Sequence, residues 1–206
     1  MKPSEIAASY DSIAHQWLEP FLETNGIRQH QTALQFRSND SDSKNAGVAL
    51  DVGCGCSGRF FRLLESAGYQ VEGLDVSERM IALAKERHPH VLFHQADICE
   101  WIPPRQYDFI TAWDSTWHAP LDHSESVLRK LCAALSTGGI LIWTTGGLDE
   151  PTEKRDSSMG PPVYYSVLGI PKTLQTIAEA GCICRHLEYD QWPEKHLYLI
   201  VQKMAV

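Results

Sequence analysis

The sequence has no long apolar run: none of its 206 residues lies in a stretch that approaches the roughly 20 apolar residues needed to cross a bilayer. Its first residues, Met1 to Glu5, also lack the apolar core of a secretory signal. Without such a signal, the six cysteines are predicted to be free thiols in a reducing cytoplasm, where disulfides are rare. The sequence therefore predicts a cytoplasmic protein without a membrane partner.

Positive charge is scarce as well: the sequence has 18 Lys and Arg residues and 26 Asp and Glu residues, and its formal net charge is −8. Nucleic acids and anionic membranes are bound mainly through a basic field, so we expect neither DNA nor RNA as a partner. Metal-ligand spacing is absent: Cys54/Cys56 and Cys182/Cys184 form C-x-C pairs, but the chain has no C-x-x-C. We therefore predict no nucleic-acid partner and no metal site.

What the sequence does have is a regular alternation of short apolar runs and helical patterns between Gly47 and Thr145. The predicted strands are 48–52, 69–75, 91–95, 107–112 and 140–145, and the predicted helices among them are 59–67, 77–87 and 124–135. Such an alternation predicts a parallel sheet with helices on both faces. The carboxyl ends of its strands should then share one edge.

The two ends of the chain follow other patterns. Apolar residues three or four apart predict an N-terminal helix over 4–23, which Pro20 should end or kink. After a helix over 172–180, strands 183–189 and 196–202 are separated by too few residues for a helical crossover, so they predict an antiparallel hairpin. The predicted fold class is α/β: a Rossmann-like, mostly parallel seven-stranded sheet with helices on both faces and a C-terminal antiparallel hairpin.

A glycine-rich turn separates the first predicted strand of this sheet from the helix that follows. Gly53, Gly55 and Gly58 have the G-x-G-x-x-G spacing of dinucleotide-binding turns, and Asp75 lies about as far downstream as a ribose-binding acid. Glycine lets the backbone turn tightly and approach a ligand closely because no Cβ intervenes. The motif favours a nucleoside cofactor, and NAD(P) in an oxidoreductase is one interpretation. Asp75 can instead cap the helix that follows it.

Carboxylates at the strand ends bear on the choice of cofactor. Asp51, Asp75, Asp97 and Asp114 lie at or near the ends of four predicted strands, so we expect them around one crevice. A pyrophosphate is held best by backbone N–H groups and is disfavoured by nearby carboxylates. Hydroxyls and positive charge suit this crevice better, because opposite charge lowers the cost of desolvating both partners. S-adenosylmethionine offers a ribose diol, an α-ammonium and a sulfonium.

Taken in order along the chain, these motifs resemble the class I S-adenosylmethionine-dependent methyltransferases, of the type that acts on small molecules. The similar segments are 50–60, 72–77, 95–98, 107–114 and 135–141, followed by the antiparallel tail. The resemblance implies S-adenosylmethionine as the cofactor and a small molecule as the substrate. One departure lies in the first motif, where Cys56-Ser57 makes the turn one residue longer than the commoner G-x-G-x-G.

The resemblance also implies which residues hold the cofactor. They are Tyr10, Trp17, Asp51, Gly53, Cys54, Gly55, Asp75, Val76, Met80, Asp97, Ile98 and Trp113. Asp75 would bind both ribose hydroxyls, and Asp97 would bind the adenine amino group with Ile98 beside the ring. Gly53 and Gly55 would contact the amino-acid portion of the cofactor.

Catalytic candidates lie in the segment 113–120, which begins at the sheet edge. They are Asp114 and His118, and His118 can act as a general base near neutral pH or can simply pack against the loop. Methyl transfer requires donor and acceptor in line and water excluded. The resemblance further implies that Tyr10 faces the methionine end and that Asp51 orients the glycine turn. The acceptor atom stays open among O, N, S and C.

The chain as a whole is expected to form a single methyltransferase domain over 1–206. Its segments would be an N-terminal helical cap and loop (1–46), a cofactor-binding core (47–145), a lid or substrate insertion (146–170) and a C-terminal helix and hairpin (171–206). The sequence leaves both a monomer and a homodimer open. Two other functions also stay open: an NAD(P)-binding oxidoreductase, and a non-catalytic S-adenosylmethionine-binding regulatory protein.

Overall fold

A central sheet organises the region of the chain that the computed structural model describes, which comprises residues 3–18, 24–37, 47–157 and 160–205. Within these residues seven strands run in the order β3-β2-β1-β4-β5-β9-β8. They are β1 (Gly47–Val52), β2 (Tyr69–Asp75), β3 (Leu92–Gln95), β4 (Tyr107–Ala112), β5 (Leu135–Gly146), β8 (Cys182–Tyr189) and β9 (His196–Lys203). The pairs from β3 to β5 are parallel, whereas β9 pairs antiparallel with both β5 and β8. The predicted seven-stranded sheet and its antiparallel hairpin are confirmed.

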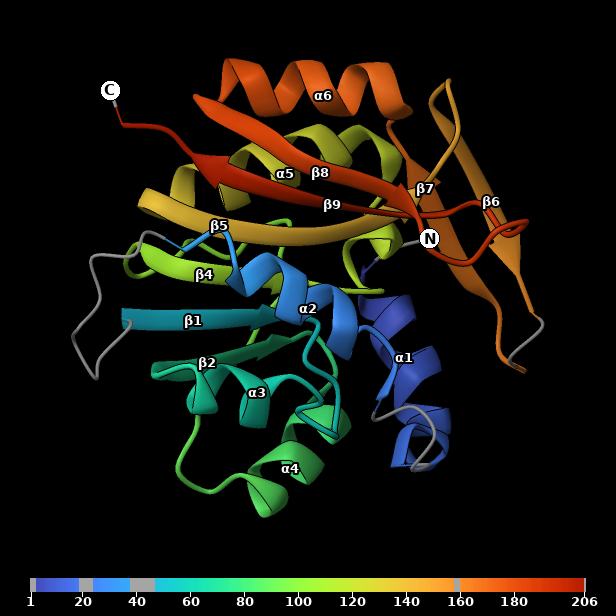
Figure 1. Cartoon of the computed structure of the whole chain (residues 1–206). Helices are drawn as coiled ribbons and strands as arrows, with labels where there is room; N and C mark the ends of the chain where they lie inside the picture. The colour runs from blue at the N-terminus through green and yellow to red at the C-terminus, as the bar shows by residue number, and fades with distance from the viewer. Residues whose placement is uncertain (1–2, 19–23, 38–46, 158–159, 206) are drawn as a thin grey trace.

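Helices cover both faces of this sheet (Figure 1). They are α2 (Ile27–Leu34), α3 (Phe61–Ser66) and α4 (Glu78–Arg87) on one face, and α5 (Leu121–Ala134) and α6 (Ile170–Glu179) on the other. Leu131 of α5 and Ile177 of α6 belong to one apolar core, together with Leu50 of β1. Leu64 of α3 belongs to a second core with Ala49 of β1. Successive strand residues point to opposite faces, so Ala49 and Leu50 pack into different cores. Both faces of β1 are therefore buried, and its sequence is apolar over most of its length.

The N-terminal region differs from the expected single helix over 4–23. The α-helix α1 (Pro3–Ile13) ends ten residues earlier, and the 3-10 helix η1 (Ala14–Leu18) continues from it. Pro20 and the polar loop after residue 37 lie outside the described residues. Helix α2 was not expected, because its eight residues bury only His30 and Ala33 and so give little apolar periodicity.

The insertion after β5 also contains structure that the sequence did not indicate. Strands β6 (Thr152–Asp156) and β7 (Val163–Val167) pair antiparallel in a separate two-stranded sheet. Residues Thr152 to Arg155 are exposed, so the strand lacks the apolar alternation by which half-buried strands are recognised. Helix α1 contacts β7, and Ile6 of α1 packs with Val163 and Tyr164.

The strand order points to one edge of the sheet as the place where a ligand would bind. The chain leaves β1 for β2 and β3 on one side, and β4 and β5 lie on its other side, so the order reverses between β1 and β4. In open α/β sheets, ligands bind beyond the carboxyl ends of the strands at such a reversal. Helix α1 lies at this end of β1 and β2 (Figure 1). No helix among the described residues has the length and apolar character of a membrane span.

Candidate functional site

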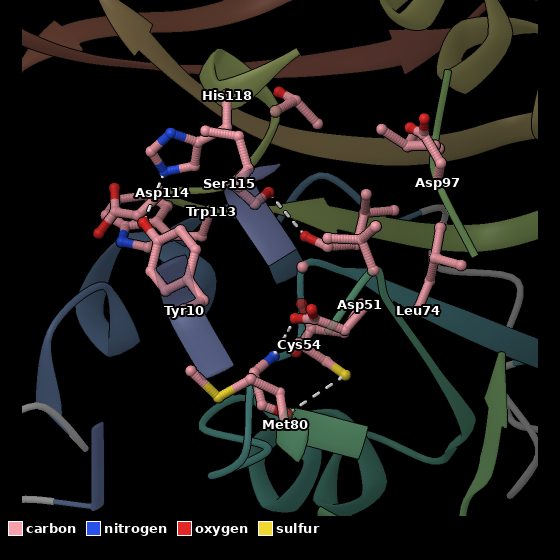
Figure 2. A pocket seen from close by; sticks show the side chains of 18 of the residues that line it. Tyr10, Asp51, Cys54, Leu74, Met80, Asp97, Trp113, Asp114, Ser115 and His118 are labelled. Atoms are coloured by element: carbon pink, nitrogen blue, oxygen red, sulfur yellow. Dashed lines mark hydrogen bonds between the residues drawn. The ribbon is translucent and has the colours of Figure 1, made fainter. Parts of the chain in front are cut away.

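A cavity lies at the carboxyl ends of β1, β2 and β4, with an empty volume of about 1080 Å³ that includes space open to solvent. All the predicted cofactor contacts and both catalytic candidates line it: Tyr10, Trp17, Asp51, Gly53, Cys54, Gly55, Asp75, Val76, Met80, Asp97, Ile98, Trp113, Asp114 and His118. Figure 2 shows Tyr10, Asp114 and His118 together at one end, and Asp97 away from them. The structure thus brings the predicted residues together, while their individual roles stay predictions.

The glycine turn between β1 and α3 forms one wall of the cavity. The N–H groups of Gly53 and Cys54 both donate to the carbonyl of Leu74, at 2.7 and 3.1 Å, which ties the turn to the end of β2. A Cβ on Gly53 would lie 2.2 Å from the Cβ of Ser115, so the loop after β4 packs directly against this glycine. A Cβ on Gly55 would meet nothing within 4 Å. The backbone at Gly55 is therefore open to a ligand.

Asp75 ends β2 and faces this turn. Its Oδ2 accepts a hydrogen bond of 2.9 Å from Gly55 N, and its Oδ1 accepts one of 2.9 Å from Ser77 N. Burial raises the pKa of Asp75, although these two N–H groups oppose the rise. Ser77, not Asp75, is the N-cap of α4, because its Oγ accepts from Met80 N at 3.0 Å. Asp75 is therefore not the N-cap of α4, and its ribose-binding role stays a prediction.

Met80 and Trp113 are walls of the cavity that also belong to the protein interior. Met80 packs with Ala14 and Cys56, and Trp113 packs with the rings of His30 and Phe60 in the core beneath α2 and α3. Both side chains are less than 5 % exposed (3 % and 4 %). They shape the cavity in addition to any contact with a ligand.

Asp51 is the most deeply placed acid of the cavity, with 3 % of its surface exposed. Burial raises its pKa from an ordinary value of 3.8 to about 7. Arg59 opposes the rise, and Asp75 adds to it by repulsion. A cationic ligand that enters the cavity would lower the pKa of this carboxyl group, because positive charge favours the ionised form.

This pKa gives the free energy of unfolding a distinct pH dependence. Between about pH 4 and pH 7 the folded protein holds a proton on Asp51 that the unfolded chain releases. The stability that Asp51 contributes is therefore present at pH 4 and is lost as the pH rises to 7. The variant Asp51→Asn should lack this loss, which makes its stability relative to the parent protein rise by roughly 2–4 kcal/mol across the interval.

Urea titrations at several pH values from 4 to 8 measure the effect. The exposed carboxylate of Asp122, whose side chain is 80 % accessible, provides the control variant Asp122→Asn. This control should follow the parent protein over the interval, apart from a small effect of its contact with His123. If the free energy of unfolding changed with pH in the same way for Asp51→Asn and for the parent protein, the burial of an ionisable Asp51 would be contradicted.

His118 is held by hydrogen bonds at both ring nitrogens. Its Nδ1 lies 2.7 Å from the carbonyl oxygen of Tyr164, which can only accept, so Nδ1 carries the proton. The Nε2 atom then accepts from the hydroxyl of Tyr10 at 2.7 Å and from Trp117 Nε1 at 3.2 Å. Burial lowers the pKa of His118 to about 4, so the ring is neutral. In this arrangement His118 positions Tyr10, and action as a base would first require Tyr10 to release Nε2.

Asp114 has a partner that the sequence analysis did not identify. His196, at the start of β9, donates from Nε2 to Asp114 Oδ1 at 2.9 Å and from Nδ1 to Asp190 Oδ1 at 2.5 Å. Gln29 Nε2 also donates to Asp190, at 2.7 Å. Burial opposes protonation of His196, yet the two carboxylates outweigh it and raise its pKa above the usual value. The signal for His196 was the hairpin itself, because β9 pairs antiparallel with β5 and so starts at the site edge, where His196 lies opposite Gly146.

Known proteins share both the sequence pattern and the fold. Residues 49–139 match the model of a family described as "Methyltransferase domain". A trans-aconitate 2-methyltransferase of Acidovorax sp. (strain JS42) is 38 % identical over 144 residues, which are 68 % of this chain and 54 % of that protein. A malonyl-[acyl-carrier protein] O-methyltransferase of Enterobacter lignolyticus (strain SCF1) is 31 % identical over 134 residues, 63 % of this chain and 53 % of that protein. The chain spans about half the length of these curated relatives.

Solved structures extend the likeness over nearly the whole chain. The 1,6-didemethyltoxoflavin-N1-methyltransferase of Burkholderia thailandensis, with bound 1,6-didemethyltoxoflavin and S-adenosylhomocysteine, has a TM-score of 0.71 at 16 % identity. The aligned region covers 98 % of this chain and 88 % of that one. An S-adenosylmethionine-dependent methyltransferase of Clostridium acetobutylicum ATCC 824 has a TM-score of 0.69 at 11 % identity, with 98 % and 99 % covered. Residues 49–139 of this chain therefore match a methyltransferase domain, and the described fold is the one that S-adenosylmethionine-dependent methyltransferases share.

Proposed function

We propose that the protein transfers the methyl group of S-adenosylmethionine to a small-molecule acceptor. The observation that carries the proposal is the gathering of Asp51, Asp75, Asp97 and Asp114 around one cavity that also exposes the backbone of Gly55. A cofactor with a ribose diol and positive charge suits this lining better than one with a pyrophosphate. The relatives named as small-molecule methyltransferases support the same activity.

The side chains present fit each portion of this cofactor. Asp75 is proposed to accept from the ribose hydroxyls, and Asp97 from the adenine amino group with Ile98 beside the ring. Trp17 lines the cavity with a buried indole N–H that has no hydrogen-bond partner among the described residues, and so offers a donor to an anionic or hydroxyl oxygen. Arg59 also lines the cavity and offers positive charge to the methionine carboxylate.

When bound, the cofactor supplies an electrophilic methyl group, so the protein has to position the acceptor and exclude water. Helix α1 is tied down on both sides of the cavity. Ser9 Oγ donates to Pro162 O at 3.1 Å, and on the other side the Asp11 carboxylate accepts from Ser77 Oγ. Tyr10, held by His118, then presents its ring and hydroxyl to the cavity. These contacts support the proposal that α1 caps the reacting end of the cavity.

The segments of the chain have proposed roles that follow from this arrangement. The core 47–145 is proposed to bind the cofactor, and β7 within the insertion 146–170 is proposed to form a wall of the acceptor space, which is supported by the hydrogen bond between Tyr164 O and His118. Within the N-terminal segment 1–46, α1 and η1 are proposed to cap the cavity, and within the C-terminal segment 171–206 the hairpin completes the sheet. We further propose a reducing, cytoplasmic compartment, which the free state of all six cysteine thiols supports.

Calorimetry with S-adenosylhomocysteine, S-adenosylmethionine and NADH tests the cofactor. We expect both sulfur compounds to bind and NADH not to bind. Binding of NADH alone would instead indicate an oxidoreductase and would overturn the proposal. Labelled methyl transfer to a panel of small amines, alcohols, thiols and carboxylates then tests the activity. Tight cofactor binding with no transfer to any member of the panel would favour a non-catalytic binding protein.

A further inference from the structure

The end of the cavity beyond the glycine turn has an excess of negative charge. Asp114 lies there with 23 % of its side chain accessible, and only its Oδ1 is engaged by His196. His196 also pairs with Asp190, so one imidazolium is set against two carboxylates. Even with His196 protonated, the three side chains together carry one net negative charge. A ligand with positive charge would be attracted to the accessible surface of Asp114.

A cluster of aromatic rings lies at the same end of the cavity as Asp114, where Tyr10 and His118 line it. The ring centroid of His118 lies 5.3 Å from that of Tyr10 and 4.9 Å from that of Tyr165. The ring of Trp117 lies 6.0 Å from that of Tyr165 and 5.7 Å from that of His196. Aromatic faces attract ammonium groups, and walls of this kind are used to recognise cationic nitrogen. One such contact exists within the protein, because Lys154 Nζ lies 5.4 Å from the centroid of the Tyr165 ring.

Positive charge that could receive an anionic acceptor is scarce at this end. Arg59 is the only Lys or Arg among the described residues that line the cavity. It lies at the glycine turn, where it donates to Asn25 O at 3.2 Å and stacks over Phe60 at 5.4 Å. The ammonium of Lys154 is paired with Asp156 at 3.3 Å. A substrate with several carboxylates would therefore bring its charge against Asp114 without a free cation to balance it.

We infer that the acceptor is an amine, bound through its nitrogen by Asp114 beside Tyr10 and His118, which line the cavity, with Trp117 and Tyr165 packed against His118. This inference rests on the proposed methyltransferase function and names the substrate class of the same site. It separates this protein from the relatives named trans-aconitate methyltransferases, whose named substrate is a carboxylate.

The reaction balances without a further reagent. The bound ammonium releases one proton to water, and the nitrogen lone pair forms the bond to the methyl carbon. The carbon–sulfur bond breaks, its electron pair stays on sulfur, and the sulfonium becomes a neutral thioether. The product is a methylated ammonium whose charge again faces Asp114. Asp114 acts here by binding and orienting the nitrogen, which keeps the acceptor in line with the donor.

Three probes of nearly equal size test the charge preference: phenethylamine, 2-phenylethanol and 3-phenylpropanoate. Their binding is measured by calorimetry on the full chain saturated with S-adenosylhomocysteine, with trans-aconitate as a fourth probe. We expect the amine to bind at least tenfold more tightly than the alcohol, and both carboxylates to bind more weakly than the alcohol. The inference would be overturned if either carboxylate bound more tightly than the alcohol, or if the amine bound no more tightly than the alcohol.

The variant Asp114→Asn assigns the preference to a residue. It should abolish the advantage of the amine over the alcohol while the dissociation constants of the alcohol and of S-adenosylhomocysteine change less than twofold. The surface variant Asp122→Asn should leave every constant unchanged. An amine preference that survives Asp114→Asn would overturn the role of Asp114. If S-adenosylhomocysteine itself fails to bind, the proposed function fails; if it binds and carboxylates are preferred, only this inference fails.

Discussion

Replacing Asp75 by alanine is expected to weaken the binding of S-adenosylhomocysteine by roughly 10- to 100-fold. A charged hydrogen-bond acceptor contributes about 1.5–3 kcal/mol to a ligand that bonds to it, and the ribose hydroxyls would lose such an acceptor. Asp75 also holds Gly55 N and Ser77 N, so its removal loosens the turn that the cofactor contacts. Both effects act in the same direction, and calorimetry of the purified variant measures their sum.

A control is needed because some of this effect is structural. Asp108, at the start of β4, makes a similar kind of contact away from the cavity: it accepts from Val48 N at 2.9 Å and from Ser136 Oγ at 2.6 Å. Asp108→Ala should lower the free energy of unfolding and leave the dissociation constant of S-adenosylhomocysteine nearly unchanged. A folded Asp75→Ala variant with the parent affinity would rule out the ribose-binding role of Asp75.

Alanine at Gly53 and at Gly55 is expected to lower the free energy of unfolding by different amounts, although both glycines have positive φ, +73° and +60°. A side chain in this left-handed region costs roughly 1–2 kcal/mol at either position. At Gly53 the new Cβ would also overlap Ser115, so we expect a total loss of roughly 2–4 kcal/mol in the free energy of unfolding. At Gly55 the Cβ enters open space in the cavity, so the fold should lose only the conformational cost.

Binding measurements complete this comparison. Gly55→Ala should weaken S-adenosylhomocysteine at least tenfold, because the methyl group occupies space that the proposed cofactor needs. The control is Gly181→Ala, which has a similar φ of +69° after α6 and meets only Lys203 Nζ, at 3.7 Å. It should show a similar loss of stability to Gly55→Ala without any loss of binding. Equal binding by Gly55→Ala and Gly181→Ala would mean that the cofactor does not approach this turn.

The sheet could be predicted from the sequence because its signals are local. Each strand from β1 to β5 contains part of a short apolar run that the sequence shows, and β2 and β4 have the predicted bounds, Tyr69–Asp75 and Tyr107–Ala112, whereas β5 begins five residues before the predicted 140–145. Elements with few buried residues could not be predicted from such local signals. The strand β6 is mostly exposed and is stabilised by pairing with β7, a tertiary contact that the pattern of Thr152–Asp156 does not report.

The candidate site divides in the same way. The carboxylates that follow parallel strands could be predicted to converge, because the chain order fixes which strand ends share an edge. The pairing of Asp114 with His196 spans 82 residues and depends on the register of β9 against β5. His118 is hydrogen-bonded to Tyr10 of α1 and Tyr164 of β7. The packing of these two elements against η3 (Thr116–His118) cannot be predicted from the sequence pattern of any one of them.

Asp114 is the only non-glycine residue with positive φ, +53°, among the described residues. Apart from glycine, asparagine and aspartate adopt this conformation at the lowest cost, so the backbone restricts which residues can replace Asp114. Asparagine keeps the shape and removes the charge. A descendant of this protein could therefore change from a charged to a neutral methyl-acceptor substrate by a single substitution, without a change in the backbone of the surrounding loop. The backbone at this one position would thus channel the evolution of specificity toward a very small set of alternatives.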